Sequence, residues 1–143
     1  DGTERVFPAA ECGFGYRKSI FSGGERLILE ASFLLEPGDS AAVKARMEDL
    51  AARRREKQPL ELPSAGSFFK RPEGQFAGAL IEGCGLKGTV VGGAQVSEKH
   101  AGFLVNRGGA TAEDVRRLME LVQETVLRET GVRLEPEVKF LGF

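Results

Sequence analysis

The sequence predicts an α+β fold, in which about three helices are mixed with short strands in an irregular order. Two observations support this class. Segments with helical apolar spacing are mixed with short branched runs that glycine and proline interrupt, and no internal repeat or low-complexity segment is present. The chain of 143 residues is also long enough for one hydrophobic core of ordinary size. We therefore expect strands and helices to share a single core.

The first clear element is a strand over residues 26–35, RLILEASFLL, which the turn EPGDS at residues 36–40 ends. Residues 6–8, VFP, also have the pattern of a strand, entered from an earlier segment. The chain opens on the turn-like Asp1-Gly2-Thr3, without a methionine. We therefore expect a fragment of a longer protein, with its main internal boundary between residues 36 and 37.

A helix is predicted after this boundary, because Asp39 or Ser40 is a suitable N-cap and apolar side chains follow at helical spacing. The far end of this helix carries the run Arg53–Arg55. Cations near the C-terminus of a helix stabilise it through the helix dipole. We interpret these arginines as a solvated helix end in preference to an anion site. The apolar side chains are Val43, Met47 and Leu50.

Two further helices are predicted. QFAGALIEGCGLKG, residues 75–88, contains a short helix that its later glycines end, with Phe76, Ala79, Leu80 and Gly83 on one face. The longest helix begins at Thr111, which forms with Asp114 a pattern similar to a capping box, and it ends at Gly131. Its apolar stripe consists of Val115, Leu118, Met119, Val122 and Val126.

The remaining strands lie around these helices. TVVGGAQVS, residues 89–97, has the pattern of a strand interrupted by Gly92-Gly93, and GFLVN, residues 102–106, has the pattern of the next strand. After Pro136 the tail alternates, which predicts a half-buried final strand. Its apolar side holds Val138 and Phe140, and its polar side holds Glu137 and Lys139.

Composition and charge exclude several classes of function. Twenty basic and 21 acidic residues give a net charge of −1, without the basic excess of a nucleic-acid-binding protein. Cys12 and Cys84 lie far apart, without CxxC or Cys/His spacing, which favours two reduced thiols over a metal site. No apolar run reaches about 18 residues and no signal-type segment opens the chain, so we expect neither membrane insertion nor secretion.

The usual catalytic patterns are absent from the sequence. Ser67 follows Ala65-Gly66 but is not part of a GxSxG elbow, and His100 lies in the polar stretch VSEKH, so a Ser/His/Asp triad is disfavoured. We interpret His100 as a loop or strand-end residue. The run GLKGTVVGGA contains neither a GxGxxG nor a P-loop pattern. Gly92-Gly93 either forms a tight turn or lets the backbone come close to a ligand.

Five segments, taken in order along the chain, resemble the C-terminal half of one enzyme family, the UDP-N-acetylenolpyruvoylglucosamine reductases, also called UDP-N-acetylmuramate dehydrogenases. Each motif alone is modest, but five in the same order form a specific pattern that extends over most of the chain. The segments are FGYRKSIF (14–21), PSAGSFFKRP (63–72), AGALIEGCGLKG (77–88), GGAQVSEKHAGFLVNRGGATAEDV (92–115) and LEPEVKFLG (134–142).

The resemblance implies a bacterial cytoplasmic flavoenzyme that uses FAD and NADPH to reduce UDP-N-acetylglucosamine enolpyruvate to UDP-N-acetylmuramate, for peptidoglycan synthesis. It implies that residues 1–36 are the trailing part of the flavin-binding half and residues 37–143 the substrate-binding domain. Nothing in the sequence resembles the family's glycine-rich flavin-binding segment. The missing N-terminal half is therefore an implied partner, and no FAD-binding residue is assigned.

The resemblance also implies three catalytic residues. Ser67 would donate a proton, while Arg17 and Glu137 would stabilise the enolate that forms on the substrate. Only 50 residues separate Arg17 from Ser67, so the chain resembles the shorter form of the family, which lacks an inserted loop over the substrate. An alternative is a free-standing UDP-sugar binding or regulatory module without flavin chemistry. The implied substrate contacts are Tyr16, Lys70 and Arg71.

Overall fold

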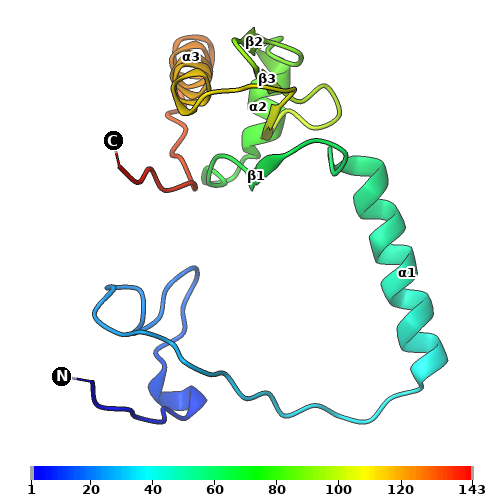
Figure 1. Cartoon of the computed structure of the whole chain (residues 1–143), viewed down its shortest axis with the longest axis vertical. Helices are drawn as coiled ribbons and strands as arrows, with labels where there is room; N and C mark the ends of the chain where they lie inside the picture. Colours follow the sequence, from blue (N-terminus) through cyan, green and yellow to red (C-terminus); the bar gives the residue numbers. More distant parts are fainter. Residues whose placement is uncertain (1, 143) are drawn as a thin grey trace. The chain divides into compact units, whose positions relative to one another are not determined.

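The computed structural model of the chain describes residues 2–142 (Figure 1). The chain divides into two compact units, Asp1–Asp39 and Ser40–Phe143. The larger unit holds the four-stranded sheet and the α-helices of the described residues, so the predicted α+β class is confirmed. The smaller unit has one short 3-10 helix, η1 (Ala9–Glu11), followed by turns.

The two strands predicted in the smaller unit are wrong, since neither residues 6–8 nor residues 26–35 form a strand. A strand needs a neighbour to take up its backbone N–H and C=O groups, and no ladder joins these segments to another described residue. The apolar side chains of the second segment are exposed, and Leu34 is 102% exposed. Asp1, where the turn-like opening was predicted, lies outside the described residues.

One antiparallel sheet, in the order β1-β4-β3-β2, forms the centre of the larger unit. The strands predicted within residues 89–97 and 102–106 are confirmed. The interruption at Gly92-Gly93 is the turn of a tight hairpin between β2 and β3. The sheet consists of β1 (Ser64–Ser67), β2 (Val90–Val91), β3 (Ala94–Val96) and β4 (Phe103–Asn106).

Helix α3 (Ala112–Thr130) packs against β2 and β3, and helix α2 (Ala77–Gly83) packs against α3, beside the sheet in Figure 1. The capping box between Thr111 and Asp114 is confirmed, with both reciprocal hydrogen bonds, and Gly131 ends α3 in a left-handed conformation. The predicted apolar stripe of α3 is also confirmed. Four of its members are buried and Val115 packs against the same core, which also includes Ile81, Ala94, Val96, Leu104 and Leu134.

Helix α1 (Ser40–Lys57) forms where it was predicted, and its last turn is basic. None of its residues is buried, so its predicted stripe of Val43, Met47 and Leu50 is exposed. The helix therefore carries the expected pattern without adding to the core of the larger unit.

Two predictions differ from the structure in detail. Helix α2 buries Ala77 and Ile81, and Phe76 is exposed, because Phe76 is the N-cap with extended backbone and so does not share the helix face. The tail is not a strand. Within the described residues it pairs at a single bridge, between Phe69 and Pro136, and one bridge does not make a ladder.

Candidate active site

The candidate site is built where β1 runs on into residues 68–70, between two other segments. On one side, the Phe68 N–H donates to the Gly102 carbonyl at 2.9 Å. On the other side, the Glu137 N–H donates to the Phe68 carbonyl at 2.9 Å. Because Ser67 is the residue before Phe68, the structure brings Ser67 and Glu137 to neighbouring positions, although they lie far apart in the sequence.

Local sequence explains how Ser67 is presented. Gly66 has a φ of +82°, which favours glycine, and the register of β1 against β4 shifts between Ser64 and Ser67, as in a bulge. Phe68 and Phe69 are both 3% exposed, and their rings meet edge to face at 5.5 Å. The two rings anchor the chain in the core, whereas Ser67 itself remains exposed.

The two cations after the phenylalanines both have protein partners. The Lys70 ammonium forms an ion pair with Glu135, with 3.0 Å between Nζ and Oε2. The guanidinium carbon of Arg71 lies 3.9 Å from the centre of the Phe76 ring, and Arg71 Nε donates to the Gln75 carbonyl at 3.2 Å. Both side chains are exposed, so each cation is oriented by the protein while remaining open to solvent.

Tyr16 and Arg17 belong to the smaller unit, where they form the two-residue tip of a tight turn. Two hydrogen bonds close this turn, from the Gly15 N–H to the Lys18 carbonyl at 2.9 Å and from the Lys18 N–H to the Gly15 carbonyl at 3.2 Å. Arg17 has a φ of 58°, and it is the one non-glycine residue within 2–142 with positive φ. A left-handed arginine is strained, and such strain is concentrated at functional sites in proteins.

His100 and the glycine pair have structural explanations. His100 lies in a loop, as predicted, where its Nδ1 accepts a hydrogen bond from the Gly102 N–H at 3.0 Å. At Gly93 an added Cβ would lie 2.4 Å from the Ala110 backbone nitrogen, and at Gly92 it would lie 2.3 Å from the Asp114 carboxyl group. The close approach that these glycines allow is therefore to the chain itself, and the tight-turn alternative is the one observed.

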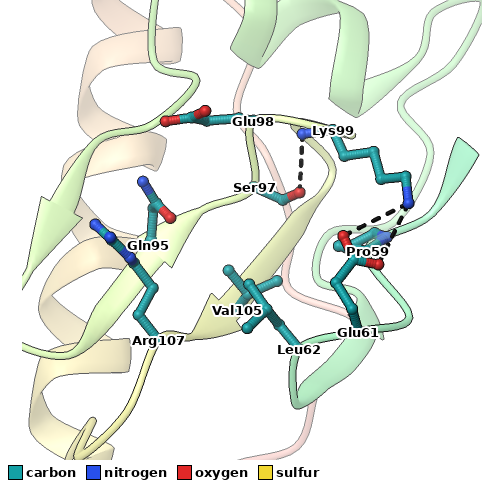
Figure 2. A pocket seen from close by; sticks show the side chains of 9 residues that line it. All are labelled: Pro59, Glu61, Leu62, Gln95, Ser97, Glu98, Lys99, Val105 and Arg107. Carbon is teal, nitrogen blue, oxygen red and sulfur yellow. Dashed lines mark hydrogen bonds and ion pairs between the residues drawn. The ribbon is translucent and has the colours of Figure 1, made fainter.

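A pocket of about 260 Å³, which the sequence analysis did not anticipate, lies beside the sheet (Figure 2). At its rim the Lys99 ammonium lies 3.3 Å from the Glu61 carboxylate. A hydrogen bond from the backbone and the interaction with Lys99 lower the pKa of Glu61. The lining contains two carboxylates and two cations, so it has no excess of either charge; it consists of Pro59, Glu61, Leu62, Gln95, Ser97, Glu98, Lys99, Val105 and Arg107.

Potential metal ligands within residues 2–142 do not cluster. In that range, no three His, Cys, Asp or Glu side chains are grouped so that they could hold a metal ion. Cys12 is a buried free thiol, and Cys84 is a half-buried one. No helix of the described chain has the length and apolar character needed to cross a bilayer.

Comparison with known proteins identifies the family. Residues 58–141 match the family model of the C-terminal domain of UDP-N-acetylenolpyruvoylglucosamine reductase. The chain belongs to this family. The match starts directly after α1 ends at Lys57, so it contains the whole sheet, α2, α3 and the segment that carries Glu137.

Individual reductases are similar over nearly the whole chain. The reductase of Exiguobacterium sibiricum is 56% identical over 92% of the chain, and that of Levilactobacillus brevis is 51% identical over 99% of it. The crystal structure of the reductase from Thermus caldophilus matches 96% of the chain with a TM-score of 0.73 and 39% identity. The chain spans 43%, 47% and 49% of these proteins, respectively. These matches do not favour the alternative of a free-standing binding module.

Proposed function

We propose that the chain is the C-terminal, substrate-binding and catalytic portion of an FAD- and NADPH-dependent reductase. The whole enzyme converts UDP-N-acetylglucosamine enolpyruvate to UDP-N-acetylmuramate for peptidoglycan synthesis in the bacterial cytoplasm. Residues 1–36 are the trailing part of its flavin-binding half, and residues 37–143 are its substrate-binding domain. Family membership supports this proposal, and the observation that carries it is the hydrogen bond from the Glu137 N–H to the carbonyl of Phe68, the residue after Ser67.

The proposed roles follow from the charge that develops on the substrate. Reduction of the enolpyruvyl double bond leaves negative charge next to the substrate carboxylate, and the adjacent carbon must then accept a proton. Ser67 donates this proton, because even a weakly acidic hydroxyl can protonate so basic a carbon. Arg17 stabilises the enolate with its planar guanidinium fork, and Glu137, in its protonated form, stabilises it by hydrogen bonding.

Substrate binding is assigned to exposed side chains next to these residues. Tyr16 precedes Arg17 at the tip of the tight turn and is 84% exposed. Lys70 and Arg71 follow the buried phenylalanines and present positive charge near Ser67. These two cations suit a substrate that carries both a diphosphate and a carboxylate.

FAD binding is not assigned to any residue of the chain. The pocket of about 260 Å³ lies below the range of roughly 300–1,000 Å³ that is usual for small-molecule sites. Its two carboxylates offset its two cations, which does not suit the diphosphate of a dinucleotide. We therefore propose the N-terminal half of the whole enzyme as the partner that binds the flavin.

The proton-donor role can be tested in the full-length reductase that contains this chain, with Ser67→Ala. Stopped-flow absorbance would follow flavin reduction by NADPH and, separately, flavin reoxidation by the enolpyruvyl substrate. We expect reoxidation to slow by about 100-fold or more, as for loss of a general acid, while reduction by NADPH stays within about two-fold.

Ser64→Ala is the matched control, because Ser64 is an exposed serine at the other end of β1. We expect both half-reactions to be unchanged in this variant. An equal loss of both half-reactions in Ser67→Ala would contradict the proton-donor role.

A further inference from the structure

The segment that carries Glu137 is held on two sides. Before Glu137, Leu134 is fully buried, and Gln123 Nε2 on α3 donates to the Leu134 carbonyl at 2.7 Å. On the other side, the Lys70 N–H donates to the Glu135 carbonyl at 2.8 Å, and the Glu137 N–H donates to Phe68. Glu137 therefore takes its position from a short backbone pairing with residues 68–70.

This pairing is short, since it consists of a single bridge. Phe69 and Pro136 face each other in an isolated antiparallel bridge, which two backbone hydrogen bonds enclose, one at Glu135 and one at Glu137. No further bridge continues this pairing within the described residues, so it forms no ladder. Such a short pairing opens easily unless side chains across it add to its stability.

The Lys70–Glu135 ion pair lies directly across this short pairing. Lys70 and Glu135 are 65 residues apart in the sequence, yet they are joined by a backbone hydrogen bond of 2.8 Å and an ion pair of 3.0 Å. Both side chains are exposed, so the ion pair is of the modest kind found at protein surfaces. A contribution of this size changes how often a short pairing opens.

We propose that Glu135 is a positioning residue, which holds Lys70 by an ion pair and thereby fixes the segment that carries Glu137 beside Ser67. Glu135 also orients the Lys70 ammonium, so that its charge stays next to the catalytic serine. The structural part of this proposal concerns this chain alone, and its consequence for turnover depends on the proposed function.

The structural part is tested by amide hydrogen exchange of the 143-residue chain, read at the Glu137 amide. We expect Glu135→Gln to speed exchange at this amide about two- to five-fold, which is the effect of losing one exposed ion pair. Glu82→Gln is the matched control, since Glu82 forms a similar exposed pair with Lys87, at 2.7 Å, elsewhere in the unit. Unchanged exchange at Glu137 in Glu135→Gln would overturn the proposal.

The functional part is tested by a double-mutant cycle in the full-length reductase, with flavin reoxidation by substrate as the readout. If Glu135 acts through Lys70, then Glu135→Gln slows reoxidation in the wild-type background, has no added effect in a Lys70→Met background, and is partly rescued by Glu135→Asp. Additive effects of the two substitutions would overturn the proposal. Failure of the proposed function would instead appear as a wild-type enzyme that the substrate does not reoxidise.

Discussion

The two units use similar apolar residues with opposite results. In the larger unit, Leu118 of α3 has no exposed surface, because the sheet and α2 supply partners for the apolar face of the helix. In the smaller unit, six of the ten residues in 26–35 are leucine, isoleucine or phenylalanine, yet these side chains are exposed. The difference shows that an apolar segment becomes buried only where another element packs against it, whatever its composition.

The largest expected effect comes from making the same substitution in both units. Leu118→Ala should lower the free energy of unfolding of the larger unit by about 3 kcal/mol, because it leaves a cavity in a closed core. Leu34→Ala, at a leucine of the smaller unit that is 102% exposed, should change the free energy of unfolding of the chain by less than about 0.5 kcal/mol. Urea denaturation followed by far-ultraviolet circular dichroism measures both values.

This pair of variants can also break the comparison. If Leu34→Ala destabilised the chain by more than about 1 kcal/mol, the leucine would have a packing partner in solution. The two units would then not differ in the way described.

Elements with strong local signals could be predicted from the sequence. The capping box at Thr111, the stripe from Val115 to Val126 and the left-handed Gly131 are set by neighbours within one helix, so α3 was predicted closely. Residues 26–35 could not be predicted in this way, because strand formation depends on a second segment and not on composition. The face of α2 was missed for a smaller reason, since it depends on whether Phe76 is the cap or the first helical residue.

The candidate site could be predicted only as a set of residue types. The resemblance to the reductase family indicated Ser67 and Glu137, but no local pattern shows that the Glu137 N–H meets the Phe68 carbonyl. The ion pair between Lys70 and Glu135 was missed for the same reason, because both residues look like ordinary exposed charges in the sequence. The pocket beside the sheet also has no local signal, because its lining comes from three separate segments.

The second prediction sharpens the comparison at the turn of the smaller unit. Arg17 occupies a left-handed conformation that costs a non-glycine residue about 1–2 kcal/mol. Arg17→Gly should therefore stabilise the turn by about 1 kcal/mol relative to Arg17→Ala, after allowance for the greater freedom of glycine in the unfolded chain. Exchange at the Lys18 amide, which bonds to the Gly15 carbonyl, should be about five-fold slower in the glycine variant.

Catalytic activity should fall in both Arg17 variants, including the one in which the turn is more stable. In the full-length reductase, both Arg17 variants should lose substrate-dependent flavin reoxidation, because both remove the guanidinium group. A more stable turn combined with lost activity would mean that the arginine is kept for its side chain at the expense of stability. Equal exchange rates in the glycine and alanine variants would show that the turn is not left-handed in solution.

The smallest expected effect concerns the stability of the larger unit at acidic pH. The Thr111 backbone N–H and hydroxyl, together with the Gly93 N–H, lower the pKa of Asp114 below its usual value of 3.8. Because the folded pKa is lower than the unfolded one, the unfolded chain takes up this proton first as the pH falls. The contribution of the carboxylate is therefore fully present above the unfolded pKa and is lost as the pH falls through the folded pKa.

Asp114→Asn should accordingly lower Tm at pH 7, and the difference from the unmodified chain should shrink as the pH approaches about 2. Glu124→Gln, at an exposed position of the same helix, controls for the removal of one negative charge from α3 and should give a smaller difference at pH 7. A difference for Asp114→Asn that stayed constant between pH 7 and about pH 2 would mean that the side chain acts through its shape and not through its charge. The link that Asp114 makes between the start of α3 and the β2–β3 turn would then be one that a neutral amide cannot replace at any pH.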